Sequence, residues 1–509
     1  MMKNRIIRDT ILLTVMQLIL DSSAIFLNGF ITRQLGASAI GIFSLMGSFL
    51  GLAGIISNGN AFLCTSRLIS EELGKKGGNP NRVLFHGIRL CIMLSLGVSI
   101  ALTIFARPIG VKFFGGSDGA MFLRFMPAAL ITGAVSSCFK GYFNACRKAS
   151  SAAFSDILEF IVKSAAIVIM TLISDDNSES TVCRIMITSV IAGNVTSLVL
   201  MFGLYAKKRI KCTEKGTLTF RRYAAFAFPI MGGGILTSIL SSTNDALVPI
   251  CLKQYGDSTE QALALFGIFE AIVIPTLFFP SVVLCSLSGI IVTESARASA
   301  SGNRERLRSI TSRLIRYTMT YGVFAAAVLI RFGRPIGELL GGGEAGGNMI
   351  SAIAPVVPFI YMEIVLEAMI KGMGLQAFSS MNYLAEYVIR ISIVLIAVSH
   401  LGFWGIALSY YASNIFGNIS RLVRLLRHTG VRFRPFSMVI SPIMYTFLTM
   451  SAADILYRLL DIRAEKVVSI AGYIVIWLLL YGGVYITAHM LTPENVRNKF
   501  FVQNEQRSM

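Results

Sequence analysis

Apolar runs about 20 residues long recur along almost the whole chain, from Ile11 to Leu491. A helix of that length matches the hydrocarbon thickness of a bilayer, which is roughly 30 Å. Hydrophobic residues make up 54% of the chain and charged residues only 14%, against roughly 25% charged residues in an ordinary soluble domain. The sequence therefore predicts an all-α polytopic membrane protein.

Windows of about 19 residues give about fourteen predicted transmembrane helices. Their ranges are 10–33, 38–64, 84–106, 121–144, 150–173, 183–206, 223–251, 263–292, 317–340, 349–373, 378–399, 402–424, 437–457 and 467–490. The first of these follows a short basic stretch, as in a signal peptide. Its apolar residues continue to Ile31, which favours a retained span over a cleaved signal.

The net charge of +19 reflects Lys and Arg residues that lie in short clusters between the apolar runs. They form no basic stripe, so no nucleic-acid partner is predicted. If the N-terminus is cytoplasmic, loops such as 207–222 and 293–316 lie inside and carry most of the basic residues, whereas the acidic loop 174–179 lies outside. This asymmetry predicts that both termini lie in the cytoplasm.

An internal repeat divides most of the chain into two parts. The residues Arg-Gln-Leu-Gly at 33–36 end the first predicted span, and Lys-Gln-Tyr-Gly at 253–256 ends the seventh. Further matching elements are Pro127 with Pro358, Lys140-Gly141 with Lys371-Gly372, and 159–163 with 386–390. The repeat predicts two six-helix lobes, 1–222 and 223–432, followed by a two-helix extension and cytoplasmic tail, 433–509.

Because six is an even number, both lobes enter the membrane in the same sense, and the repeat is parallel. Two parallel lobes related by an axis along the membrane normal predict a V-shaped central cleft that opens to either side. An alternating-access transporter has this architecture, whereas a channel more often surrounds its pore with several identical subunits.

Polar side chains within the predicted spans fall on helical stripes, as the wall of a hydrophilic cavity requires. A charged side chain within a span costs a few kcal/mol, so it normally faces the bundle interior or water. Three of the carboxylates, Asp245, Glu270 and Glu363, have no evident partner nearby in the sequence. The predicted cavity or coupling residues are Asp21, Asn28, Asn244, Asp245, Glu270, Glu363 and Glu367.

Two Glu residues each precede a basic residue by four positions, as Glu159 precedes Lys163 and Glu386 precedes Arg390. This spacing allows the two charges to meet on one helix face. Each pair is interpreted either as a gate or substrate contact, or as an intrahelical ion pair that only stabilises the bundle.

Four basic residues near the membrane faces could hold a diphosphate or another headgroup, and the alternative is that they extend to the interface without a ligand. They are Arg33, Lys140, Lys253 and Lys371. A further cluster, Pro229 with Gly232, Gly233 and Gly234, predicts a hinge in the seventh span, and the alternative is a static kink.

Catalytic signatures are missing from the sequence. There is no GxxxxGK[ST] loop, HExxH or GxSxG motif. The eight cysteines are scattered without metal-ligand spacing and are interpreted as packing residues. The chain is therefore predicted not to be an enzyme and to contain no metal or cofactor. Energy for transport would come from a gradient of H⁺ or Na⁺.

Several elements together resemble the multidrug/oligosaccharidyl-lipid/polysaccharide exporter superfamily, and in particular its polysaccharide transporter branch. They are the residues 33–36 followed by 39–45, the Lys-Gly-Tyr-Phe sequence at 140–143, and Glu159 with Lys163. The superfamily often has Arg at the positions of Lys140 and Lys163. The resemblance covers essentially the whole chain, and it implies that the last two spans form a groove for a lipid tail.

The predicted function is that of a flippase for a polyprenyl-diphosphate-linked oligosaccharide, or for a peptidoglycan or polysaccharide precursor. Its partners would be this lipid-linked sugar, membrane lipids and enzymes of cell-wall or polysaccharide synthesis. One alternative is a drug antiporter of the MATE type, driven by protons or sodium. A membrane scaffold is a third possibility, although a scaffold would not need polar cavity stripes.

Overall fold

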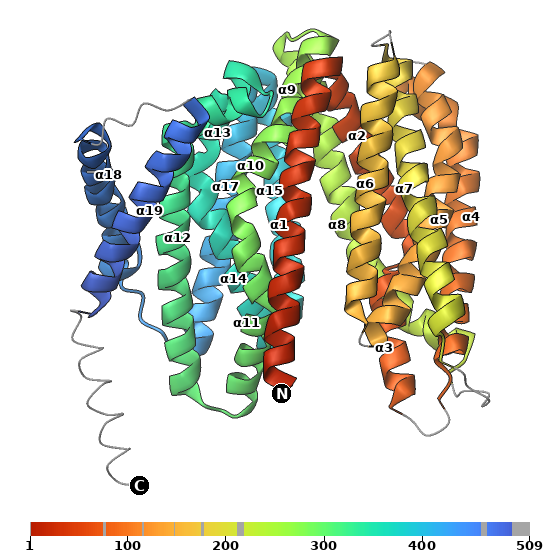
Figure 1. Cartoon of the computed structure of the whole chain (residues 1–509), viewed down its shortest axis with the longest axis horizontal. Coiled ribbons are helices and arrows are strands. Elements are labelled where there is room, and N and C mark those ends of the chain that lie inside the picture. Colours follow the sequence, from red (N-terminus) through yellow and green to blue (C-terminus); the bar gives the residue numbers. More distant parts are fainter. Residues whose placement is uncertain are drawn as a thin grey trace. The chain divides into compact units, whose positions relative to one another are not determined.

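The computed structural model describes residues 2–74, 78–113, 117–146, 148–174, 178–210, 218–459 and 466–490, and every regular element within these ranges is helical (Figure 1). The elements of the first half are α1 (Met2–Leu35), α2 (Ala37–Asn58), α3 (Ala61–Leu73), α4 (Pro80–Phe113), α5 (Ser117–Ala145), α6 (Ala149–Ile173), α7 (Glu179–Lys208) and α8 (Phe220–Tyr255). Those of the second half are α9 (Thr259–Ile268), η1 (Phe269–Val273), α10 (Ile274–Phe278), η2 (Phe279–Ser281), α11 (Val282–Ala300), α12 (Arg304–Leu339), α13 (Gly343–Ile353), η3 (Ala354–Val356), α14 (Val357–Gly372), α15 (Gln376–Ile393), η4 (Val394–Val398), α16 (Ser399–Leu401), α17 (Phe403–Thr429), η5 (Phe436–Ile440), α18 (Ser441–Leu459) and α19 (Lys466–Met490).

Each of the fourteen predicted spans coincides with one helix or with a run of consecutive helical pieces. Within the described ranges, twelve stretches are long and apolar enough to cross a membrane. The other two predicted spans correspond to α6, with 25 residues, and α17, with 27 residues. At about 1.5 Å per residue, both helices exceed the roughly 30 Å of a hydrocarbon core. The all-α architecture is confirmed.

Several spans are interrupted, and the interruptions have local causes. The second span breaks where Gly59 and Asn60 adopt left-handed backbone angles, with φ of 58° and 53°, so that α2 ends and α3 begins. In the eighth span a π-helical turn precedes Pro275, and a 3₁₀ turn contains Pro280. Proline lacks the amide hydrogen that an α-helix needs, so the helix changes its pitch around it.

The chain forms two compact units, which are described separately. The first unit comprises Met1–Ser286, Gly337–Met349 and Ser380–Ser413, and the second comprises Leu287–Ile336, Ile350–Ser379 and Asn414–Met509. The units group segments by mutual contact and not by chain order. The lobe limits at 222 and 432, and the cleft between the lobes, stay predictions.

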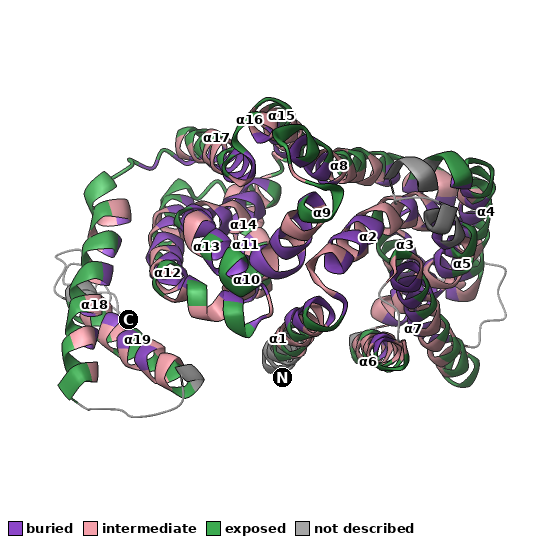
Figure 2. Cartoon of the chain, turned by 90° about the horizontal axis from the view of Figure 1, so that it is seen from above, coloured by how far each residue is buried: buried purple, intermediate pink, exposed green. Residues whose placement is uncertain are grey.

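In the first unit, α5 packs between α4 and α7, and α6 packs on α7 (Figures 1 and 2). Their core joins aromatic residues, such as Tyr142 and Phe143, to the buried thiols of Cys91 and Cys138, whose sulfur atoms lie 3.5 Å apart. The cysteines of the described ranges are free thiols, most of them buried. They therefore serve as small packing residues in this unit.

The glycine of the repeated Lys-Gly element allows a close helix crossing in both units. A Cβ at Gly141 of α5 would lie 2.7 Å from the carbonyl oxygen of Phe62 in α3, and a Cβ at Gly372 of α14 would lie 2.5 Å from that of Val292 in α11. Real Cβ atoms do not approach this closely, so only glycine permits these helix crossings. The fourth span of each predicted lobe thus crosses the C-terminal part of the second span at a glycine.

In the second unit, the two last helices are anchored on α12 by an aromatic cluster. Phe324 of α12 contacts Trp477 and Tyr481 of α19, with ring centroids 5.2 and 4.8 Å apart. The hydroxyl of Tyr481 also donates a hydrogen bond of 2.9 Å to the carbonyl of Thr320. Helices α18 and α19 lie side by side (Figure 2).

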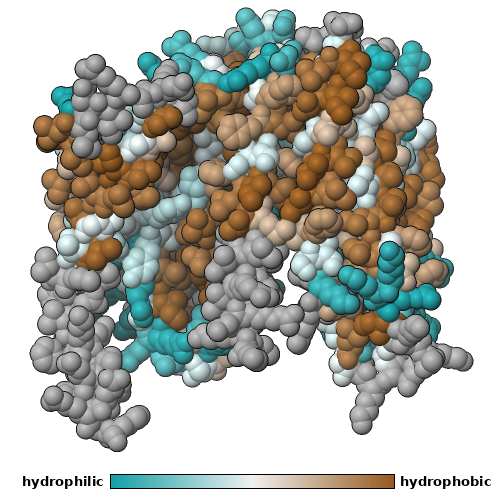
Figure 3. Space-filling model, viewed as in Figure 1, coloured by the Kyte–Doolittle hydropathy of each residue, from teal (hydrophilic) through white to brown (hydrophobic). Residues whose placement is uncertain are grey.

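The outer surface suits a lipid environment. Apolar residues cover the middle of the visible face of each unit, and hydrophilic residues gather towards the helix ends (Figure 3). Large apolar side chains are exposed in the described ranges, including Leu172 of α6 and Leu479 of α19, at 65% and 70%. Such exposure is favourable only where the surrounding solvent is itself apolar.

Candidate functional site: a polar cavity and two charged clusters

A cavity of about 380 Å³ lies within the first unit. Its walls come from α2, α5, α6 and α7 and from the break between α2 and α3. We call it the polar cavity, and its lining residues are Leu50, Gly51, Gly54, Ile55, Asn58, Asn60, Ala129, Leu130, Gly133, Ala134, Ser136, Ser137, Lys140, Glu159, Lys163, Val190 and Asn194. Amide, hydroxyl and charged groups therefore face a common space inside an otherwise apolar bundle.

Lys140 is the most strongly paired charge of the polar cavity. Its ammonium lies 2.6 Å from a carboxylate oxygen of Asp156 and 2.8 Å from one of Glu159, both on α6. The Lys140 side chain is 14% exposed. These two contacts tie α5 to α6, and they already satisfy the cation that the sequence proposed as a headgroup ligand.

The intrahelical pair between Glu159 and Lys163 that the spacing predicts does not form, because Glu159 bonds to Lys140 instead. The ammonium of Lys163 makes no hydrogen bond or ion pair with any described residue, although Glu159 still attracts it at longer range. Lys163 is half-buried and lines the polar cavity.

Three asparagines lie in the cavity wall, and two of them form hydrogen bonds between its helices. Asn58 donates to the hydroxyl of Ser137 over 3.2 Å and accepts from the backbone N–H of Ala61 over 3.1 Å, which caps α3 across the helix break. Asn194 of α7 donates to the carbonyl of Ala129 over 2.8 Å. Asn60 sits at the break with its side chain on the cavity.

A second group of charges in the first unit surrounds Asp245 of α8. Its carboxylate accepts hydrogen bonds from Ser48 of α2 over 2.5 Å and from Asn244 over 3.3 Å. The predicted coupling residues Asp245 and Glu270 are close enough to interact electrostatically with each other and with the guanidinium of Arg390. Two carboxylates therefore share one cation.

Arg390 does not pair with Glu386, although the spacing predicts it. The guanidinium of Arg390 donates to the hydroxyl of Ser413 over 3.0 Å and lies 4.4 Å from the ring centroid of Tyr410. Glu386 accepts a hydrogen bond of 2.7 Å from Asn382, one turn earlier in α15. Both predicted intrahelical pairs are thus replaced by contacts with other residues.

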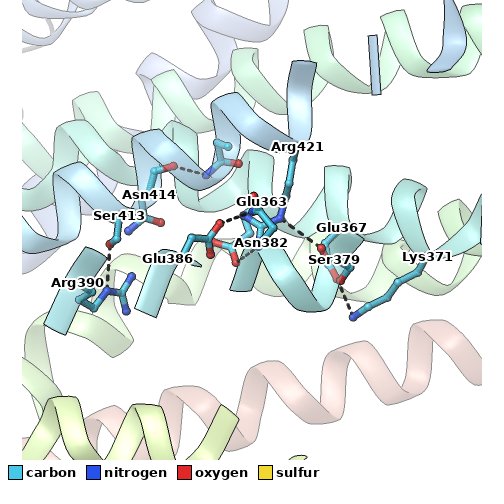
Figure 4. A network of polar contacts seen from close by, with 11 residues as sticks. Glu363, Glu367, Lys371, Ser379, Asn382, Glu386, Arg390, Ser413, Asn414 and Arg421 are labelled. Atoms are coloured by element: carbon cyan, nitrogen blue, oxygen red, sulfur yellow. Dashed lines mark hydrogen bonds and ion pairs between the residues drawn. The ribbon is translucent and has the colours of Figure 1, made fainter. Parts of the chain in front are cut away.

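The second unit contains a buried charge network around Arg421 of α17 (Figure 4). Its guanidinium lies 3.3 Å from Glu363 and 3.3 Å from Glu367, and its side chain is fully buried. Glu367 also pairs with Lys371 at 3.2 Å and accepts a hydrogen bond from Ser379. Glu363, which has no evident partner nearby in the sequence, is paired in the fold. Its partner comes from another helix, 58 residues along the chain.

Sequence reasoning did not single out Arg421 as a buried residue, although the predicted span 402–424 contains it. A signal was present, because Asn414, Asn418 and Arg421 follow the i, i+4, i+7 spacing of one helix face. All three are buried.

The remaining predicted site residues are dispersed in the first unit. Asn28 donates to the carbonyl of Ala271 over 2.8 Å, and Asp21 accepts from Gln17 over 2.8 Å on the same helix. Arg33 donates to backbone carbonyls of Glu338 and Leu339 at the end of α12. Lys253 is exposed near the end of α8. None of these four contributes to the polar cavity.

The predicted hinge lies in a continuous helix. α8 runs without a break through Pro229, and Gly232 and Gly233 have open space where a Cβ would be. Only Gly234 is constrained, since its Cβ would lie 3.1 Å from the amide nitrogen of Asn60. Bending at this point stays a prediction. Within the described ranges, no group of three or more His, Cys, Asp or Glu side chains could hold a metal ion.

Comparisons with known proteins give a consistent assignment. A family model described as polysaccharide biosynthesis protein matches residues 6–288, more than half of the chain. Stage V sporulation protein B of Bacillus subtilis (strain 168) is 20% identical over 489 residues, which cover 92% of each chain. Sporulation protein YkvU of the same organism is 20% identical over 382 residues, which cover 73% of this chain and 83% of the relative.

Solved structures share the fold. A structure of the lipid II flippase MurJ in an inward closed conformation matches with a TM-score of 0.69 at 14% identity, covering 94% of this chain and 99% of the other. An inward-facing multidrug resistance MATE family transporter matches with a TM-score of 0.63 at 16% identity, covering 82% and 94%. The predicted polytopic membrane fold is confirmed. The chain therefore belongs to the polysaccharide biosynthesis protein family, and it shares the multi-pass membrane fold of these solved structures.

Proposed function

We propose that this transporter is an alternating-access flippase for a lipid-linked sugar, either a polyprenyl-diphosphate oligosaccharide or a peptidoglycan or polysaccharide precursor. The observation that carries the proposal is the polar cavity, which places amides and the cations of Lys140 and Lys163 inside a lipid-exposed bundle. An anionic headgroup crosses hydrocarbon only where protein replaces its water. The names of the relatives, which include a lipid II flippase and a sporulation protein, support this class.

We further propose that the chain lies in a bacterial plasma membrane with both termini in the cytoplasm, as the distribution of basic residues indicates. In that orientation the polar cavity has Asn58 and Asn60 of its wall near the cytoplasmic end of the second predicted span, 38–64. Lipid-linked sugars assembled by cytoplasmic enzymes would reach it from that side. Those enzymes and the membrane lipids are the expected partners.

Coupling to H⁺ or Na⁺ would use Asp245 and Glu270. These two carboxylates share the single cation of Arg390, so one of them can bind a proton or another cation with little change in surrounding structure. The Arg421 network is less suited to this task, because Arg421 and Lys371 balance both of its carboxylates. The same pair supports the alternative function, a MATE-type antiporter of cationic drugs.

The test is transport in proteoliposomes of a fluorescent polyprenyl-diphosphate disaccharide, with native mass spectrometry of lipids that co-purify. We expect flipping well above that of empty liposomes, and a large loss in Lys140→Gln. The exposed Lys208 at the end of α7 gives a matched control, because Lys208→Gln removes the same charge outside the cavity. Transport of cationic dyes against protons, without lipid flipping, would favour the antiporter.

The hinge has its own test. Gly232→Ala meets no steric obstacle and stiffens α8, so slower flipping with unchanged substrate binding would support bending at this point. Unchanged flipping would support a static kink.

A further inference from the structure

The polar cavity contains two lysines in different electrostatic situations. Lys140 bonds to two carboxylates, at 2.6 and 2.8 Å. Lys163 faces the same space, and its ammonium has no ion pair or hydrogen bond within the described part of the chain. A half-buried ammonium without a partner is unfavourable, because burial removes part of its hydration.

The acidic residue best placed in the sequence to pair with Lys163 is paired with another lysine. Glu159 lies four residues earlier on the same helix, the position from which it could pair with Lys163. Lys140 takes that carboxylate instead. The arrangement leaves one positive charge in the cavity that no described side chain neutralises at close range.

Close helix packing fixes the stem of Lys163. A Cβ at Gly193 of α7 would lie 3.1 Å from the carbonyl oxygen of Glu159 and 3.3 Å from the Cβ of Lys163. The bare backbone of α7 therefore packs directly on the turn of α6 that carries both residues. The position of the Lys163 side chain is set by two helices and not by a mobile loop.

Uncharged polar groups line the same cavity as this cation. A Cβ at Gly133 would lie 3.0 Å from the amide nitrogen of Asn194, so the glycine makes room for that amide at the wall. Gly234 does the same for the amide of Asn60. Amide side chains both donate and accept hydrogen bonds, as sugar hydroxyls do. The cavity volume of about 380 Å³ falls within the usual range for small-ligand sites, roughly 300–1,000 Å³.

We propose that the polar cavity binds an anionic sugar unit, with Lys163 pairing to the negatively charged oxygen group and Asn60 and Asn194 bonding to the neighbouring hydroxyls. This proposal rests on the proposed flippase function and names the part of the substrate that this cavity recognises. The negative group has two sources, a phosphate attached to the sugar or a carboxylate on the sugar ring. Both present the same oxygen chemistry to an ammonium.

The experiment titrates the purified full-length protein calorimetrically with small soluble ligands. N-acetylglucosamine 1-phosphate and glucuronic acid are the two charged probes, each compared with its neutral parent, N-acetylglucosamine or glucose, and inorganic phosphate is the fifth ligand. We expect at least one charged sugar to bind about tenfold or more tightly than both its neutral parent and inorganic phosphate, since one charge-assisted bond is gained. The charged sugar that does so identifies the source of the negative group.

Variants separate the charge of Lys163 from its packing. Lys163→Gln and Lys163→Met should abolish the preference for the charged sugar, Lys163→Arg should retain it, and Lys208→Gln should leave it unchanged. If the charge-removing variants do not fold, Lys163→Arg and the ligand series on the unaltered protein still decide the question.

Equal binding of charged and neutral sugars, equal binding of inorganic phosphate, or no binding of any probe at millimolar concentration would overturn the proposal. So would a charge preference that survives Lys163→Gln. Lipid flipping by the same preparation is measured separately. Flipping without a charge preference would refute this inference and leave the flippase function intact, whereas loss of flipping itself would refute the proposed function.

Discussion

The Lys-Gly element occurs twice in the chain, at 140–141 and at 371–372, and the charged side chains around it are arranged differently in the two units. In the first unit Lys140 is 14% exposed and pairs with Asp156 and Glu159 of a neighbouring helix, beside an open polar cavity. In the second unit Lys371 is 50% exposed and pairs along its own helix with Glu367, while the buried Arg421 occupies the interior.

The glycine after each lysine packs on the C-terminal part of the second predicted span of its lobe, so the backbone packing at the two glycines is equivalent. The two regions differ in the cation that pairs with two carboxylates, which is Lys140 in the first unit and Arg421 in the second. The lysine with two carboxylates lines a polar cavity, whereas the guanidinium with two carboxylates is fully buried. The Lys140 region is thus suited to bind a ligand, and the Arg421 region is suited to hold its helices together.

Removal of Arg421 should have the largest effect on stability. Arg421→Gln leaves Glu367 buried without its guanidinium and Glu363 without an ion pair, so we expect a loss of about 3–5 kcal/mol in unfolding free energy. Denaturant unfolding in detergent, followed by circular dichroism, measures it. If stability changes little while transport stops, the assignment of the Arg421 network as a structural element is wrong.

The two repeated glycines should be similarly intolerant of a methyl group. Gly141→Ala and Gly372→Ala each place a Cβ against a backbone carbonyl, and each should cost about 1–3 kcal/mol of unfolding free energy because the helices must separate. Thermal unfolding of the two variants side by side provides the comparison. The exposed Gly51, whose Cβ would meet nothing within 4 Å, is the matched control. A large effect at only one of the repeated glycines would break the equivalence of the two units.

Replacement of Lys140 should reduce lipid flipping much more than it reduces the unfolding free energy. In Lys140→Gln the carboxylates of Asp156 and Glu159 remain partly exposed, at 52% and 30%, so they can be hydrated, and we expect a stability loss of only about 1 kcal/mol. Flipping should fall much more than stability. Equal and large losses in both would indicate that Lys140, like Arg421, is mainly structural.

Lys371 should show the smallest effect. Arg421 still neutralises the buried Glu367 in Lys371→Gln, so only an intrahelical pair with a half-exposed lysine is lost, worth about 0.2–0.5 kcal/mol. The shift in melting temperature should stay close to experimental error, and flipping should be retained. A severe transport defect would instead support the predicted role of Lys371 as a headgroup ligand.

Hydropathy and repetition predicted the helices well because lipid solvation acts on every span in the same way. The positions of single charges were harder to predict. The partner of Glu159 is Lys140, on a different helix, and the partner of Glu363 is Arg421, two predicted spans further along the chain. Such contacts depend on how helices face one another, which intrahelical spacing cannot reveal. The polar cavity depends in addition on the left-handed break at Asn60, which no hydropathy window detects.

The distribution of tryptophan gives the molecule a convenient optical property. The chain has two tryptophans, and one lies in each unit. Trp404 is 63% exposed, whereas Trp477 is completely buried and donates a hydrogen bond of 3.1 Å to Thr449. Their emission should differ in wavelength and in access to quenchers. Two single-tryptophan variants, made by replacing the other indole with Phe, would therefore report on each unit separately by fluorescence, without any attached dye.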